Sequence, residues 1–259
     1  IRRQRQMCIR DRSAVSYKNP VVDIAMPDPT VIKAADGYFY MYATESTRNV
    51  PIMKSKDLVQ WTYCNTAFTN KTRPRFEPKA GIWAPDINYI NNKYVLYYAM
   101  SVWGGEQTCG IGVATADSPQ GPFTDHGKMF RSNEIGVQNS IDPSFLQYEG
   151  RNYLVWGSFR GIYVIELTED GLSLKPGAEK KRIAGTAFEA AYIHKHGDYY
   201  YMFASIGSCC EGIRSTYKVV VGRSKKVWGP YKDKSGKPML KNGYSLVIGA
   251  NDHFVGNGH

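Results

Sequence analysis

Long apolar runs are missing from this sequence. None approaches the roughly 20 residues that a helix needs to cross a bilayer, although 42% of the 259 residues are hydrophobic. The first residues also lack the apolar stretch of a secretory signal. We therefore expect no membrane span. A chain of this length can bury one sizeable core as a single domain.

Cysteine is scarce as well. The chain has five, and no two have the C-x-x-C spacing of a zinc site, so we do not expect one. Cys209 and Cys210 are adjacent. Two interpretations of this pair stay open: free thiols, or a strained disulfide between neighbouring residues.

A sustained helical period is the third absence. No segment keeps apolar residues at helical spacing over ten or more positions. Apolar, β-branched and aromatic residues instead alternate in short runs, such as IGVAT from Ile111 and VVVGR from Val219. Such runs are typical of strands, and the pattern predicts an all-β protein.

One sequence pattern occurs four times along the chain. It consists of an acid, a short apolar strand, a polar turn and an aromatic-rich strand. The four acids, 47 to 58 residues apart, are Asp28, Asp86, Asp142 and Glu189. A repeat of about 40 to 50 residues that holds four strands is typical of a β-propeller blade. Because the acid precedes the innermost strand each time, a propeller would gather these carboxylates at one end of its central channel.

A further repeat begins near the end of the sequence, in VIGANDHFVGNGH. It would place His259 where the earlier repeats have an acid, but the strands that should follow are not in the sequence. We therefore predict a propeller with at least one blade almost wholly missing. An open ring exposes strand edges, and we expect this to lower stability.

The N-terminal segment, residues 1–16, does not resemble the blades. Its first twelve residues contain five Arg and one Asp, in a chain of formal net charge +10. A basic arm that binds nucleic acid is one interpretation. We favour a non-native or disordered leader and predict that nucleic acid is not a partner. The remaining basic excess would aid contact with an acidic polymer only weakly.

Several separated motifs carry a family resemblance. PDPTVI, WAPDI, NSIDPSF, FEAAYI, SIGSCCEGIRSTYKVVVGRS and GNGH occur in this order between about Val22 and His259. Together they resemble glycoside hydrolase family 43, and within it the members that degrade α-L-arabinan. The resemblance implies a five-bladed propeller, present here as about four blades and the start of the fifth. Residues 17–259 would then be an incomplete catalytic domain.

The same resemblance implies an activity. It is the inverting, endo-acting hydrolysis of α-1,5-linked L-arabinofuranosyl bonds in arabinan, which forms side chains of plant cell-wall pectin. We expect a secreted or periplasmic monomer that needs no cofactor for its chemistry. Two alternatives stay open. One is an exo-acting α-L-arabinofuranosidase or β-xylosidase, and the other is a propeller that binds carbohydrate without cleaving it.

Three carboxylates take roles from the resemblance, motif by motif. Asp28 of PDPTVI resembles the general base, Glu189 of FEAAYI the general acid, and Asp142 of NSIDPSF the residue that orients the acid and modulates its pKa. An inverting glycosidase needs a protonated acid and an ionised base roughly 6.5 to 9.5 Å apart. A third carboxylate nearby favours the protonated form of the acid. Ala190 directly follows the acid, where the family commonly has Gly.

Five further residues are candidates for binding. Asp86 is either structural or a ligand of sugar hydroxyls, and Trp83 is either a stacking face for a furanose ring or part of the core. Asn139 and Ser158 are hydroxyl contacts or turn residues. His259 of GNGH resembles the family's channel histidine, which helps to hold a calcium or other ion, mostly through waters.

Overall fold

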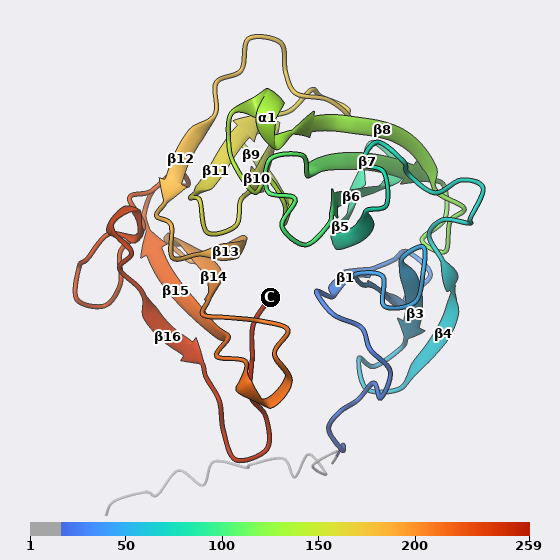
Figure 1. Cartoon of the computed structure of the whole chain (residues 1–259), viewed down its shortest axis with the longest axis horizontal. Coiled ribbons are helices and arrows are strands. Elements are labelled where there is room, and N and C mark those ends of the chain that lie inside the picture. Colours follow the sequence, from blue (N-terminus) through green and yellow to red (C-terminus); the bar gives the residue numbers. More distant parts are fainter. Residues whose placement is uncertain (1–16) are drawn as a thin grey trace, which may run out of the picture.

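The computed structural model describes residues 17–259, which form four antiparallel sheets around a common axis (Figure 1). The prediction of a leader at residues 1–16 lies outside the described part of the chain. Each sheet has four strands, so the all-β propeller architecture that the repeats predict is confirmed.

The strands follow the repeats of the sequence. The first sheet contains β1 (Thr30–Lys33), β2 (Phe39–Tyr42), β3 (Pro51–Ser55) and β4 (Trp61–Thr66). The second contains β5 (Gly81–Ile90), β6 (Lys93–Ser101), β7 (Gly110–Ala116) and β8 (Thr124–Arg131). The third contains β9 (Ser144–Tyr148), β10 (Arg151–Trp156), β11 (Ile162–Glu166) and β12 (Lys181–Ala184). The fourth contains β13 (Glu189–His196), β14 (Tyr199–Ile206), β15 (Lys218–Ser224) and β16 (Ser245–Ile248).

Within each sheet the strands are ordered as in the chain, from the centre of the ring outwards (Figure 1). The innermost strands are β1, β5, β9 and β13, and each contacts the next one. Asp28 and Asp142 lie just before an innermost strand, Glu189 begins one, and Asp86 lies within β5. This arrangement positions the site, because equivalent ends of these strands share one face of the ring.

Three apolar cores hold consecutive sheets together. Tyr42 and Leu96 belong to the core between the first two sheets, Tyr97 and Trp156 to the core between the second and third, and Met202 to the core between the third and fourth. These side chains are almost completely buried. As the repeats suggest, the aromatic-rich second strands serve mainly to pack the blades together.

Helices play a minor part in the described residues. They are α1 (Ser132–Ile135), η1 (Gly212–Arg214) and η2 (Met239–Lys241). None of them is long and apolar enough to cross a membrane.

The segment predicted to start a fifth blade begins with the last two residues of β16, Val247 and Ile248, and forms no further strand. Residues 249–259 run into the centre of the ring, where the chain ends (Figure 1). There the backbone N–H of His259 donates a hydrogen bond of 2.7 Å to Oγ of Ser205. His259 thus lies in the central channel among the predicted carboxylates.

Candidate active site

The structure brings the three predicted carboxylates together. Asp28 and Asp142 each stand two residues before an innermost strand, and Glu189 is the first residue of β13. Burial raises the pKa of Asp142 to about 7; the charge of His259 opposes this rise, and the charges of Glu189 and Asp28 add to it. Asp28 and Glu189 are therefore close enough to influence the protonation of Asp142.

A left-handed backbone recurs where the chain enters the innermost strands. The φ angle is 52° at Asp28, 57° at Asp142 and 52° at Ala190. This region costs a residue other than Gly about 1 to 2 kcal/mol, and such strain is often found at functional sites. Gly, which the resemblance leads us to expect at position 190, would adopt this angle without that cost.

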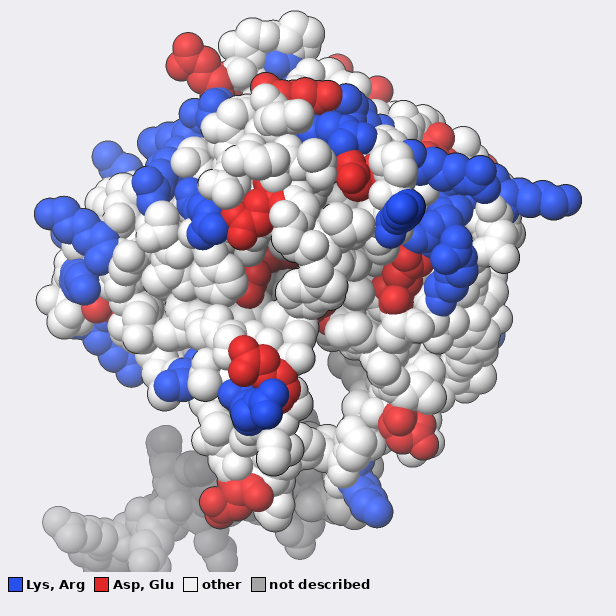
Figure 2. All heavy atoms as spheres, in the orientation of Figure 1, with Lys and Arg blue, Asp and Glu red and all other residues white. Residues whose placement is uncertain are grey.

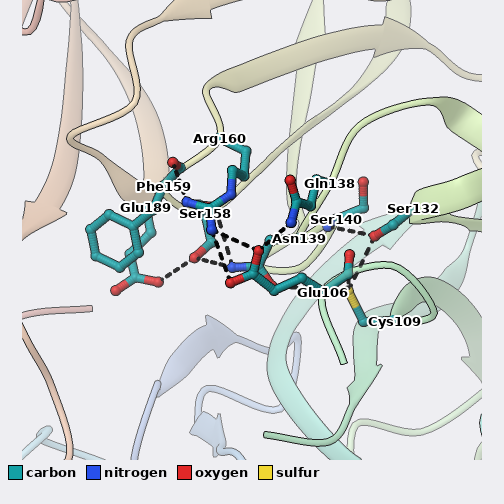
Figure 3. Close-up of polar contacts among 10 residues, drawn as sticks. All are labelled: Glu106, Cys109, Ser132, Gln138, Asn139, Ser140, Ser158, Phe159, Arg160 and Glu189. Carbon is teal, nitrogen blue, oxygen red and sulfur yellow. Dashed lines mark hydrogen bonds and ion pairs between the residues drawn. The ribbon is translucent and has the colours of Figure 1, made fainter. Parts of the chain in front are cut away.

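Glu189 is buried and accepts a hydrogen bond on each carboxylate oxygen. Tyr217 donates its hydroxyl to Oε1. Ser158 donates its hydroxyl to Oε2 at 2.7 Å (Figure 3). Ser158 in turn accepts a hydrogen bond of 2.9 Å from Nδ2 of Asn139. This chain of polar groups fixes the orientation of Glu189 in a site where its side chain has little freedom.

Asp142 is bound to the fourth sheet through the backbone. The N–H of Ala190 donates a hydrogen bond of 3.2 Å to Oδ2 of Asp142. Since Ala190 directly follows Glu189, this bond connects the two carboxylate-bearing segments. Asp142 has only 5% of its surface exposed, and its raised pKa follows mainly from that burial.

Asp28 is the most open of the three. Its side chain is 25% exposed, and its Oδ1 lies 3.2 Å from Nδ1 of His259. Thr44 donates its hydroxyl to Oδ2 and accepts a hydrogen bond of 2.7 Å from the N–H of Ala84. Burial alone would lower the pKa of His259, but the charges of Asp142, Asp28 and Glu189 raise it overall. Asp28 is thus oriented on both oxygens and still reaches solvent.

Asp86 connects two sheets. Its Oδ2 accepts hydrogen bonds of 2.7 Å from the backbone N–H of Phe145 in β9 and from Nδ2 of Asn88 in β5. Burial raises its pKa to about 6. These contacts favour the structural interpretation of Asp86, and contact with a sugar hydroxyl stays a prediction.

Trp83 lies beside an exposed aromatic neighbour. Its ring centroid is 5.5 Å from that of Trp103, whose side chain is 77% exposed. Trp83 also packs against the small cluster formed by Ala99, Cys109 and Ile141. Both earlier interpretations of Trp83 therefore have a physical basis. Its contact with the cluster fits a core residue, and the exposed ring of Trp103 beside it fits a stacking face.

A polar network continues outwards from Asn139. The side chain of Glu106 accepts hydrogen bonds from Gln138 at 2.7 Å and from Arg160 at 2.8 Å, and the carbonyl of Glu106 accepts the N–H of Asn139 at 2.8 Å (Figure 3). Contacts between the loops that carry Glu106, Asn139 and Ser158 therefore hold the Ser158 hydroxyl group in position to bind Glu189.

Cys209 and Cys210 lie in the loop that follows β14. Their sulfur atoms are 2.6 Å apart, and Cys210 is exposed. Burial raises the pKa of the Cys209 thiol to about 12, with further increases from Cys210, Glu189 and Asp28. The pair thus lies near the carboxylates.

The resemblance predicts an ion beside His259. Across residues 17–259, no three or more His, Cys, Asp or Glu side chains are arranged to hold a metal ion. His259 instead faces Asp28, whereas calcium prefers six to eight oxygen ligands. The side chains present do not form such a set by themselves, and an ion held mostly through waters stays a prediction.

Two residues that contact the carboxylates were not among the predicted site residues, Thr44 and Tyr217. The sequence does contain a signal for each. Thr44 ends the aromatic phrase GYFYMYAT, as Ser158 ends RNYLVWGS, and Tyr217 belongs to the STY part of a motif that carried the resemblance. Hydroxyl groups at these repeat positions could have been proposed as partners of the acids.

Known proteins match nearly the whole described chain. The family model described as "Glycosyl hydrolases family 43" matches residues 17–259. The extracellular endo-α-(1→5)-L-arabinanase 1 of Bacillus subtilis is 38% identical over 89% of this chain and 75% of its own length. The extracellular exo-α-(1→5)-L-arabinofuranosidase ArbA of Cellvibrio japonicus is 35% identical over 90% of this chain and 73% of its own length.

A solved structure agrees with these matches. It is the α-L-arabinanase of Cellvibrio cellulosa complexed with arabinohexaose, and it superposes on this chain with a TM-score of 0.82 and 33% identity. The match covers 90% of this chain and 81% of the other.

Proposed function

We propose that this chain, which belongs to glycosyl hydrolases family 43, is an endo-acting arabinanase that hydrolyses α-1,5-linked L-arabinofuranosyl bonds. One observation carries the proposal: Asp28, Asp142 and Glu189 lie together at the centre of the ring. Each of them belongs to the motif from which its role was predicted. Arabinan, a side chain of plant cell-wall pectin, is the substrate.

The division of labour follows from the surroundings of each carboxylate. Glu189 is buried and oriented by Ser158 and Tyr217, which suits a general acid that must deliver a proton to one atom, the leaving glycosidic oxygen. Asp28 is partly exposed and oriented by Thr44, which suits a base that holds a water molecule.

The reaction is then a single displacement. Water attacks the anomeric carbon from the face opposite the leaving group while Asp28 takes its proton, and Glu189 protonates the departing oxygen. The product carries the inverted, β configuration. Asp142 acts through its bond to the N–H of Ala190 and through its charge, both of which bear on the position and protonation of the neighbouring acid.

Relatives support the choice of substrate and of an endo mode. The B. subtilis relative is named an endo-arabinanase, which supports the endo mode. The C. cellulosa arabinanase is described as a complex with arabinohexaose, which supports the substrate class. The related ArbA is named an exo-acting arabinofuranosidase, which makes exo cleavage the second candidate. Loops that close one end of a groove decide between these modes.

Product analysis on linear α-1,5-arabinan tests the proposal. We expect a ladder of oligosaccharides early in the reaction, before arabinose accumulates. Arabinose as the sole early product would establish the exo mode. Saturable binding without any product, in a sample shown to be folded, would identify a carbohydrate-binding propeller instead. Chromatography of the same sample with light scattering tests the predicted monomer.

Secretion is part of the proposal. Both curated relatives described above are named extracellular, and a polysaccharide of the plant cell wall must be met outside the cell that degrades it. Fractionation of the source culture, with this protein detected by antibody in the medium, the periplasm and the cells, tests this location.

A further inference from the structure

A cationic cavity lies outside the proposed catalytic site. It has a volume of about 360 Å³, and four of its lining side chains are cationic: Arg48, Arg73, Arg75 and Lys79. Cavities that hold small molecules commonly measure about 300 to 1,000 Å³. The proposed hydrolysis uses none of these residues.

The cavity shares a face of the ring with the carboxylates. Its wall includes Arg73, which is paired with Glu45, and Glu45 directly follows Thr44, the residue that binds Asp28. The N–H of Ile82, at the start of the innermost strand β5, donates a hydrogen bond of 3.0 Å to Oε1 of Glu45. In Figure 2, Lys and Arg side chains gather on the right of this face, where Figure 1 places the loop between β4 and β5.

Two of the charged groups at the cavity are already engaged. Arg73 binds both carboxylate oxygens of Glu45, and both side chains are buried. Glu77, the acid of the lining, is held by Arg131. These two ion pairs form part of the wall of the cavity. Because the charges within each pair cancel, they add little net charge to it.

The other three cations remain available. Arg48, Arg75 and Lys79 are exposed and form no ion pair within residues 17–259. Asn70 anchors both guanidinium groups, since its Oδ1 accepts Nε of Arg48 at 3.0 Å and its carbonyl accepts Nη2 of Arg75 at 2.9 Å. A guanidinium group has five N–H donors, so each can still bind an anion from a fixed position.

We propose that this cavity binds carboxylate-bearing sugar units, such as the galacturonate of an acidic polysaccharide. A planar guanidinium group matches a carboxylate with two parallel hydrogen bonds. The inference rests on the proposed function, because arabinan is attached in pectin to a backbone rich in galacturonate. A cationic cavity on the catalytic face would hold the galacturonate-rich backbone of the polysaccharide, while its neutral arabinan side chain reaches the three catalytic carboxylates.

Calorimetric titration with oligogalacturonate tests the site. The comparison is between the unchanged 259-residue chain, the double variant Arg48→Gln/Arg75→Gln, and the charge-matched control Lys234→Gln/Lys237→Gln, which alters two exposed lysines elsewhere. We expect the arginine variant to bind about tenfold more weakly and the lysine control to bind as the unchanged chain does. Circular dichroism melts establish that all three are folded.

Three results of the oligogalacturonate titrations would overturn the inference. They are no binding of oligogalacturonate to the unchanged chain, an equal loss in both double variants, and equal binding of the oligomer after its carboxyl groups are reduced to alcohols. Competition with inorganic phosphate at fixed ionic strength separates a carboxylate-sugar site from a general anion site, because equal affinity for phosphate would also contradict it. Hydrolysis of neutral linear arabinan is measured in parallel, so failure of the enzyme and failure of this cavity give different results.

Discussion

The hydroxyl group of Ser158 donates a hydrogen bond of 2.7 Å to Oε2 of Glu189, although the two residues belong to neighbouring blades. Ser158 follows the second strand of its blade, and Thr44 occupies the same repeat position in the first blade, where it binds Asp28. The repeat therefore supplies an oriented hydroxyl group to both the proposed acid and the proposed base.

Ser158→Ala removes one donor from Glu189. Charge-assisted hydrogen bonds contribute about 1.5 to 3 kcal/mol, so we expect kcat on linear arabinan to fall about ten- to a hundredfold. The matched control is Ser173→Ala on an exposed turn, which should leave kcat unchanged. An unaltered kcat in Ser158→Ala would remove this residue from the account of the site.

Thr44→Val removes the donor to Asp28 and the acceptor of the Ala84 N–H, with little change in side-chain size. We expect a similar loss of kcat because the base is no longer oriented. Thr44→Ser restores the hydroxyl group and should recover most of the activity. Equal activity of the Val and Ser variants would contradict a positioning role for Thr44.

Asp86→Ala separates the two interpretations of Asp86. If its role is structural, the variant leaves the N–H of Phe145 and the amide of Asn88 without an acceptor and loses about 1 to 3 kcal/mol of stability. Urea unfolding measures this loss. A variant of normal stability with a raised KM for arabinan would instead support contact with the sugar.

Stability should also depend on pH through Asp86. Burial raises its pKa from the usual 3.8 to about 6, so the folded state holds this proton more tightly than the unfolded state does. Its stabilising contribution is present below about pH 4 and is lost as the pH rises through about 6. Asp86→Asn cannot lose a proton there, so its stability relative to the unchanged chain should increase between these pH values. A difference that stays constant with pH would contradict the raised pKa.

Much of the fold follows from local pattern. The repeated pattern of an acid, a short apolar run and an aromatic-rich run predicted the two innermost strands of each blade. It could do so because alternation and β-branched residues are local signals. The partners of the acids could not be read in this way. The bond from the Phe145 N–H to Asp86 depends on how two blades meet, and Tyr217 reaches Glu189 from the long loop before β15 of the same blade. Periodicity predicts which residues form strands, whereas these contacts depend on how blades pack and on the path of a long loop.

The rate of arabinan hydrolysis by Asp28→Ala and Glu189→Ala, compared with the unchanged chain, tests the central claim most directly. Removal of a general base or a general acid should lower kcat about a hundred- to ten-thousandfold, while circular dichroism and unfolding midpoints show that each variant is folded. If either folded variant retains activity within about tenfold of the unchanged chain, that carboxylate does not have the role assigned to it.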